Sequence, residues 1–206
     1  MIEVFTANTP NGVKIPIALE ELGVSYQLEI LDLSKQEQKR PSFLKINPNG
    51  RIPAIIDHDG PGAAPLRVFE SGAILFYLAE KFGALLPTDP AKRIDAIAWT
   101  YFQTGGIGPM MGQAGYFKRN VPEFEAGFDR FYRESQRLVG VVEAQLTDTP
   151  YFAGDDISIA DIMHIGWIDR APDYFGFDLS PYPAVSAWRQ RMLSRDGVQR
   201  GLRALQ

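Results

Sequence analysis

The chain has 206 residues, of which 45% are hydrophobic, and a formal net charge of −4 at pH 7. This composition is ordinary for a globular protein with a substantial core, and the lack of a dense lysine and arginine stripe argues against nucleic acid as a partner. The sequence contains no cysteine, which excludes disulfides, thiolate metal sites and a cysteine nucleophile of its own. Any thiol chemistry must therefore use a thiol that a ligand supplies.

The sequence indicates neither membrane nor metal binding. Its longest apolar stretch, at 73–79, is too short to span a bilayer, and its first residues lack the basic start of a signal peptide, so we expect a cytoplasmic protein. The two histidines, His58 and His164, lie far apart and have no cysteine beside them. This pattern supports neither a zinc site nor a Ser-His-Asp relay.

Strand and helix signals alternate over residues 1–84, which predicts a mixed sheet with crossover connections. Gly23 is a stop signal for the first helix, and Glu20 and Glu21 are expected to face away from its apolar side. The predicted elements, in chain order, are a strand over 2–5, a helix over 15–22, a strand over 26–30, a short helix over 41–46, strands over 54–56 and 66–69, and a helix over 72–82.

The rest of the chain is predicted to be helical. Asp89 and Pro90 form a helix start at the end of a short linker, 85–90, and we expect an all-α domain over 91–206. Ser158 and Asp161 have the spacing of a capping box, which predicts a folding signal without chemistry. The arginine-rich segment 189–195 is expected to be a solvated helix face.

The most informative residues are Pro53 and the pair Glu70-Ser71. Pro53 stands before an apolar run, where an X-Pro bond can be cis, and its neighbours can offer backbone groups to an extended ligand, as in a thioredoxin-like fold that holds a peptide. Ser71 opens a helix, whose free N–H groups suit a ligand carboxylate, while Glu70 can pair with an ammonium. The alternatives are an edge-strand proline and a plain helix cap.

These motifs resemble those of the cytosolic glutathione S-transferases over nearly the whole chain. The matching features are Arg51-Ile52-Pro53-Ala54, Phe69-Glu70-Ser71, the helix at 74–78, and Gly154 before Ser158-Ile159-Ala160-Asp161. A second set resembles the bacterial nu-class branch, which is associated with glutathione-dependent disulfide reduction: Thr9-Pro10-Asn11-Gly12, Gln38 with Arg40-Pro41, the glycine cluster at 105–110, and Gln113.

The resemblance implies an α/β thioredoxin-like domain over 1–84 followed by an all-α bundle, a homodimer, glutathione as co-substrate and no metal. Glu70 and Ser71 would hold the γ-glutamyl end, and the backbone of Ile52 with Pro53 would cradle the cysteinyl unit. By family position Gln38 and Arg51 would take the glycyl carboxylate, and Arg130 would reach glutathione. Each of the last three could instead be a plain surface residue.

The catalytic role would be to turn the glutathione thiol into a thiolate, because the thiolate is the nucleophile. Other branches of the family place a Tyr, Ser or Cys near the end of the first strand, whereas this chain offers Thr9 and Asn11. The Thr9 hydroxyl or the Asn11 amide N–H could donate to the sulfur. Alternatively, both serve only as turn and cap residues.

The glycine cluster at 105–112 lies in an otherwise helical stretch, where glycine costs stability. It predicts a helix break or a close approach, with Met110, Met111 and Tyr116 lining a pocket for the second substrate; a simple helix–helix contact is the alternative. Two functions stay open: a glutathione-dependent transferase or disulfide reductase, and a transferase-like binding or protein-interaction module without catalysis.

Overall fold

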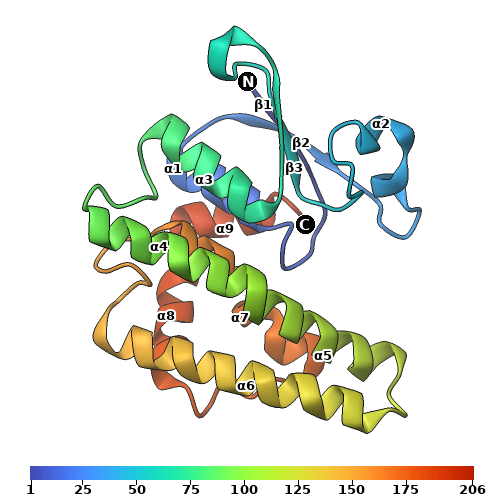
Figure 1. Cartoon of the computed structure of the whole chain (residues 1–206), viewed down its shortest axis with the longest axis vertical. Coiled ribbons are helices and arrows are strands. Elements are labelled where there is room, and N and C mark those ends of the chain that lie inside the picture. The colour runs from blue at the N-terminus through green and yellow to red at the C-terminus, as the bar shows by residue number, and fades with distance from the viewer. The chain divides into compact units, whose positions relative to one another are not determined.

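A computed structural model describes residues 1–206, apart from the side chain of Ala63 (Figure 1). The described residues divide into two compact units. Unit 1 contains Met1–Leu85 together with Ser194–Gln206, and unit 2 contains Leu86–Leu193. Among the described residues, no helix combines the length and apolar character needed to cross a bilayer.

Unit 1 is built on a mixed sheet of four strands in the order β2-β1-β3-β4, counted over the described residues. β1 pairs in parallel with β2 and antiparallel with β3, which pairs antiparallel with β4. The elements are β1 (Ile2–Thr6), α1 (Lys14–Leu22), β2 (Tyr26–Ile30), η1 (Glu37–Lys39), α2 (Pro41–Leu44), β3 (Ala54–Asp57), η2 (Pro61–Ala63), β4 (Leu66–Phe69), α3 (Ser71–Phe82) and α9 (Asp196–Arg203). The predicted thioredoxin-like fold class is confirmed.

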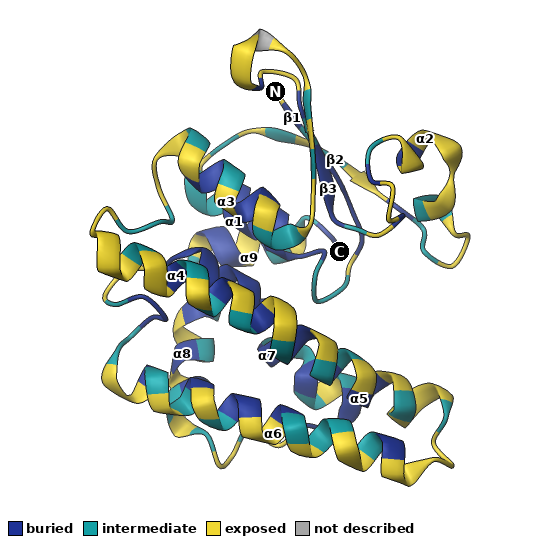
Figure 2. Ribbon diagram, in the orientation of Figure 1, coloured by how far each residue is buried: buried dark blue, intermediate teal, exposed yellow. Residues whose placement is uncertain are grey.

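The central strands of the sheet are buried, whereas the edge strands are partly exposed. β1 and β3 are almost wholly buried, while β2 and β4 alternate between half-buried and exposed positions (Figure 2). Helices α1 and α3 end at Gly23 and Gly83, whose φ angles of 65° and 67° are left-handed. Glycine adopts this conformation without steric cost, which explains why both helices stop there.

The last helix of the chain packs against the first. A Cβ built on Gly201 of α9 would lie 2.6 Å from the Cα of Ile17, so only glycine allows this approach. The Glu21 carboxylate pairs with Arg195 at 2.7 Å, and Glu20 pairs with Arg200 at 2.6 Å. The two acids therefore face the α9 segment rather than water. These contacts make α9 a part of unit 1.

The structure bears on two sequence predictions, the solvated helix face at 189–195 and the division into two domains. The solvated face predicted for 189–195 is wrong at both ends, because Arg189 pairs with Asp169 at 2.7 Å and Arg195 pairs with Glu21. Whether 1–84 and 91–206 fold as separate domains stays a prediction, since a grouping of contacts does not measure independent folding.

Unit 2 is helical, as predicted. Its elements are α4 (Pro90–Phe102), the π-helix η3 (Gln103–Ile107), α5 (Gly108–Asn120), α6 (Glu125–Asp148), α7 (Ile159–Phe175) and α8 (Pro183–Leu193). Gly105 and Gly106, the first glycines of the cluster, lie in the π-helix, so the predicted break in the α-helical hydrogen bonding is confirmed. The helix–helix contact is also present, because Cβ atoms on Gly112 and Gly115 would meet the rings of Trp167 and Tyr174 of α7.

Local capping signals define where two helices of unit 2 begin. The Asp89 carboxylate accepts a hydrogen bond from the Lys92 N–H at 2.9 Å, with Pro90 at the first helical position. Ser158 and Asp161 form the predicted capping box at the start of α7. Asp161 is fully buried and also accepts from the indole N–H of Trp188 at 2.9 Å, so this box fastens α8 to α7.

Candidate functional site

The turn before β3 presents the residues predicted to cradle an extended ligand. The Ile52–Pro53 peptide bond is cis, as its position in the sequence allows. Pro53 is buried, Ile52 is half-buried and Arg51 is exposed. The buried side chain of Asn47 shapes this turn, since its amide nitrogen donates to the Arg51 carbonyl at 2.6 Å. The roles of these residues in ligand binding stay predictions.

Glu70 and Ser71 form the start of α3. Glu70 has a φ of 70°, which is uncommon for a residue with a side chain and is strained. Such backbone conformations cluster at ligand-binding sites. Glu70 is the N-cap residue of α3 but its side chain makes no capping hydrogen bond, and Ser71 is the first residue of the helix.

The turn over 9–12 connects β1 to α1 through closely spaced hydrogen bonds. The Gly12 N–H donates to the Thr9 hydroxyl oxygen at 3.0 Å, and the Thr6 hydroxyl donates to the Gly12 carbonyl at 2.8 Å. A Cβ on Gly12 would lie 1.9 Å from the carbonyl oxygen of Ala7, so the turn requires glycine. Because Thr9 uses a lone pair in the turn, its hydroxyl hydrogen can still be donated to another group. A turn role and a catalytic role are thus compatible.

Lys14 contacts two residues of the candidate site and was not predicted from the sequence. Its side chain is 1% exposed, and its ammonium donates to Asn11 Oδ1 at 2.8 Å and to Ser71 Oγ at 3.4 Å. Burial lowers its pKa from the ordinary 10.5 to about 7, while the negative charge of Glu70 acts in the opposite direction. The available signal was a lysine directly before the apolar face of a predicted helix.

Lys14 also fixes the orientation of Asn11. An ammonium group has donors only, so the atom of the Asn11 amide that faces it is the oxygen. The amide nitrogen of Asn11 then points away from the Lys14 ammonium. Asn11 is half-buried, so this nitrogen belongs to a residue that a ligand can reach.

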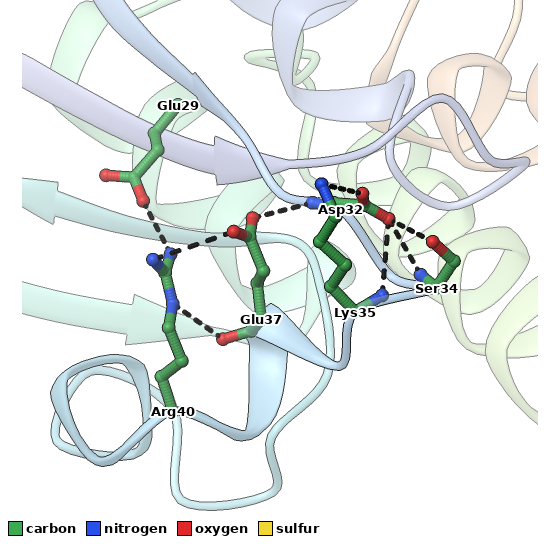
Figure 3. A network of polar contacts seen from close by, with 6 residues as sticks. All are labelled: Glu29, Asp32, Ser34, Lys35, Glu37 and Arg40. Atoms are coloured by element: carbon green, nitrogen blue, oxygen red, sulfur yellow. Dashed lines mark hydrogen bonds and ion pairs between the residues drawn. The ribbon is translucent and has the colours of Figure 1, made fainter.

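Gln38 lies in η1, within a loop braced by charged side chains (Figure 3). Arg40 pairs with Glu29 at 3.1 Å and with Glu37 at 3.8 Å, and the Glu37 carboxylate accepts from the Asp32 N–H at 2.8 Å. Hydrogen bonds from Ser34 and Lys35 hold the pKa of Asp32 down, at about 2. Asp32 therefore stays ionised, and able to accept the hydrogen bonds from Ser34 and Lys35, at all ordinary pH values.

The amide oxygen of Gln38 is buried and has no hydrogen-bond partner among the described residues. An unsatisfied buried polar atom costs about 1–3 kcal/mol, which a ligand can recover by bonding to it. A half-turn of the amide places its nitrogen at the same point, so Gln38 can offer either a donor or an acceptor there.

The remaining predicted residues lie in unit 2. In α5, Met110 is half-buried, Met111 is fully buried, and Tyr116 is 49% exposed with its ring 5.7 Å from that of Phe117. Arg130 is exposed on α6. The second-substrate pocket and the contact of Arg130 with glutathione stay predictions. Among the side chains that the structure describes, no group of three or more His, Cys, Asp or Glu is placed to hold a metal.

Two family models match most of the chain. Residues 2–80 match the glutathione S-transferase N-terminal domain, and residues 110–196 match the glutathione S-transferase C-terminal domain. The disulfide-bond oxidoreductase YfcG of Escherichia coli is 43% identical over 204 residues, which are 98% of this chain and 94% of that protein.

Solved structures give the same picture. A glutathione transferase from Burkholderia graminis, with two glutathione molecules bound per subunit, has a TM-score of 0.94 and 41% identity, and the match covers 98% of this chain and 87% of that one. A glutathione transferase from Pseudomonas putida, with one glutathione disulfide bound per subunit, has a TM-score of 0.91 and 40% identity, with coverage of 98% and 90%.

Proposed function

Because this chain belongs to the glutathione S-transferase family, we propose that it is an enzyme that reduces disulfides or conjugates electrophiles with the thiol of bound glutathione. One observation supports this most directly. In unit 1 the turn that carries Asn11 and the helix start that carries Ser71 both lie within reach of the Lys14 ammonium. Two segments predicted to bind opposite ends of a γ-glutamylcysteinyl unit thus lie side by side.

Each part of glutathione has a counterpart in unit 1. The γ-glutamyl carboxylate would bind at the start of α3, where Ser71 and backbone N–H groups meet the positive end of the helix. Glu70 would pair with the γ-glutamyl ammonium in a charge-assisted hydrogen bond. Next to cis-Pro53, the backbone of Ile52 would pair with the cysteinyl unit. Gln38 and Arg51 would receive the glycyl carboxylate.

Catalysis would depend on the ionisation of the bound thiol, which in water has a pKa near 8.5 and is mostly protonated at neutral pH. The hydroxyl of Thr9 and the amide nitrogen of Asn11 would donate hydrogen bonds to the sulfur and so favour the thiolate. Since the chain has no cysteine, glutathione supplies the attacking thiol of the reaction.

Disulfide reduction then proceeds in two balanced exchanges. The glutathione thiolate attacks one sulfur of the disulfide, a mixed disulfide forms, the original S–S bond breaks, and one substrate sulfur leaves and is protonated. A second glutathione thiolate attacks the glutathione sulfur of the mixed disulfide. This step releases the other substrate thiol and oxidised glutathione, so two electrons pass from two glutathiones to the substrate. Conjugation would use the same thiolate to attack an electrophilic carbon.

The two activities are distinguished by parallel assays of the purified protein with a small alkyl disulfide and with an aryl halide. We expect the double variant Thr9→Ala/Asn11→Ala to lose about 100-fold in kcat, as is typical when donors to a developing charge are removed. The control Thr147→Ala/Asn120→Ala changes exposed residues of unit 2 and should keep full activity. Unchanged kcat in the Thr9/Asn11 variant would refute this catalytic assignment.

Retention on glutathione-agarose tests the binding site independently of catalysis. Glu70→Gln removes the charge that would meet the ligand ammonium and should reduce binding by about 10-fold or more. Glu123→Gln changes an exposed acid of unit 2 and should be retained like the wild type. If the wild-type protein is not retained, the proposal fails in favour of a transferase-like interaction module without catalysis.

We also propose that the protein forms a homodimer. In α4, Ile94 and Tyr101 are 63% and 72% exposed, and their spacing of two helical turns places them on one face. Light scattering should give twice the chain mass for the wild type and the chain mass for Tyr101→Glu. Phe124→Glu, at a residue that is 54% exposed, is the control and should leave the mass unchanged. A monomeric wild type would disprove the dimer.

A further inference from the structure

Lys14 connects two segments of unit 1 that are far apart in sequence. Its ammonium donates at 2.8 Å to Asn11 Oδ1, in the turn before α1. It also donates at 3.4 Å to Ser71 Oγ, 57 residues further along the chain, in the first turn of α3. The lysine side chain is 1% exposed, whereas its partners Asn11 and Ser71 are half-buried, so the ammonium is shielded from bulk water and its partners stay within reach of a ligand.

A buried lysine is an expensive way to fill this position. Removing an ammonium from water disfavours its charged form, and burial accordingly lowers the pKa of Lys14 to about 7. A methionine has a similar length and would fill the space without this cost. The protein thus carries a destabilising group at the point where its two predicted ligand-binding segments meet, which suggests a functional reason.

We propose that Lys14 is the positioning residue that holds the thiol-binding turn against the carboxylate-binding start of α3, so that both halves of the glutathione site form together. This inference rests on the proposed function, because it assumes that glutathione is the ligand of the site. It adds a residue that unites two binding segments and acts through them.

The two contacts orient both partners of Lys14. Toward Asn11 the lysine requires the amide oxygen, which directs the amide nitrogen to the opposite side, where a thiol can be met. Toward Ser71 it requires the hydroxyl oxygen as acceptor, so the hydroxyl hydrogen is directed to a different partner, such as a carboxylate. Loss of the ammonium would release both orientations at once.

The charge of Lys14 should also couple ligand binding to the uptake of a proton. Glu70 already acts on the ammonium through its negative charge. A ligand carboxylate bound at Ser71 would bring a negative charge beside the ammonium, whereas the ligand ammonium at Glu70 would act in the opposite direction. Because Ser71 contacts Lys14 directly, we expect the carboxylate to dominate and to favour the protonated form of Lys14. Binding at a pH slightly above 7 should therefore be coupled to the uptake of part of a proton.

Calorimetry with S-methylglutathione tests this coupling, since that ligand has no thiol whose ionisation would release a proton. Titration at pH 7.5 in two buffers of different ionisation enthalpy should show proton uptake by the wild type and none by Lys14→Met. The exposed-lysine control Lys92→Met should behave like the wild type. Equal proton uptake in the wild type and Lys14→Met would overturn the proposal.

Steady-state kinetics test the positioning role. Ser71→Ala should mainly raise KM for glutathione, and Asn11→Ala should mainly lower kcat and raise the pKa of the bound thiol, read from thiolate absorbance. Lys14→Met should do both, each by about 10-fold, as expected when a hydrogen bond to a charged group is lost. Adding Lys14→Met to either single variant should then have a smaller further effect than it has alone.

The outcomes separate this inference from the function on which it rests. If the wild type does not bind S-methylglutathione, the proposed function fails. If the wild type binds and Lys14→Met changes neither KM nor kcat, only the positioning role of Lys14 fails. Should Lys14→Met not fold, Lys14→Gln, which keeps a donor but no charge, provides the same comparison. A loss of thermal stability without a change in KM or thiol pKa would show a purely structural role and refute the proposal.

Discussion

Two buried charged side chains, one in each unit, make an informative comparison. Lys14 in unit 1 and Asp161 in unit 2 both lie in the first turn of a helix, and they are 1% and 0% exposed. Burial shifts both toward the neutral form, since it raises the pKa of the Asp161 carboxyl and lowers that of the Lys14 ammonium. Their partners are what distinguishes them.

Asp161 is bonded to groups that complete the fold. It accepts from the N–H groups of Ser158 and Phe152 and from the indole of Trp188. Lys14 instead contacts Asn11 and Ser71, which the family resemblance assigns to ligand binding. The comparison teaches that a buried charge signals function through the identity of its partners rather than through its burial.

The largest predicted effect on the free energy of unfolding is that of Asp161→Ala, and it tests whether Asp161 is structural. The substitution leaves buried donors on Ser158, Phe152 and Trp188 without an acceptor, so we expect a loss of about 3–5 kcal/mol in the free energy of unfolding. Urea denaturation measures this loss, with Asp155→Ala, whose side chain is 83% exposed, as control. A loss no larger than that of the control would mean that Asp161 is not a structural anchor.

The contact between Gly201 and Ile17 involves no charge, so it shows how much close packing alone contributes to stability. Gly201→Ala places a Cβ 2.6 Å from the backbone of Ile17, so the helices must shift, at a cost of about 1–3 kcal/mol. Gly140→Ala is the matched control, because nothing lies within 4 Å of its Cβ, and it should stabilise α6 by about 0.5–1 kcal/mol. Thermal or urea unfolding of both variants checks that Gly201→Ala lowers the free energy of unfolding and that Gly140→Ala raises it.

Lys14→Met should give the reverse of the Asp161 result. Since the substitution removes a buried charge and keeps the volume, we expect stability at pH 7 to be unchanged or to increase by about 1–2 kcal/mol. Glutathione binding should fall in the same variant. Urea denaturation and calorimetry on one preparation compare the two effects, and a loss of stability as large as that of Asp161→Ala would place both residues in the same structural class.

The last predicted effect, which develops gradually with pH, is a pH dependence of stability that originates in Lys14. Its pKa is about 7 in the folded protein and about 10.5 when unfolded, so between these values the unfolded state binds more protons. Stability should therefore rise with pH in this window, by at most about 1.4 kcal/mol per pH unit. The difference in unfolding free energy between wild type and Lys14→Met, measured at pH 7, 8 and 9, isolates this slope. A constant difference would contradict it.

The sequence predicts those parts of the fold that are specified locally. The strands of the sheet, the stop at Gly23, the cap at Asp89 and the capping box at Ser158 each depend on residues within a few positions of one another. The cis bond before Pro53 and the helix opening at Ser71 are local in the same sense. The family resemblance rests on these local motifs.

Nonlocal contacts explain what the sequence did not predict. The link from Lys14 to Ser71 and the approach of Gly201 to Ile17 join residues from distant segments, and neither leaves a periodic signal. Burial of the Gln38 amide oxygen depends on how a whole loop closes. Arg189 and Arg195, which were predicted to be solvated, pair with acidic residues from distant segments, Asp169 and Glu21.

The packing of α9 on α1 has a consequence for the order in which the protein is made. A ribosome releases the chain from its N-terminus, so the sheet and α1 emerge long before residues 196–203 exist. Until then the surface of α1 around Ile17, with Glu20 and Glu21 beside it, lacks its covering helix. Unit 2, an uninterrupted segment, has all its residues earlier. The first part of the polypeptide to be synthesised is therefore the last to be completed.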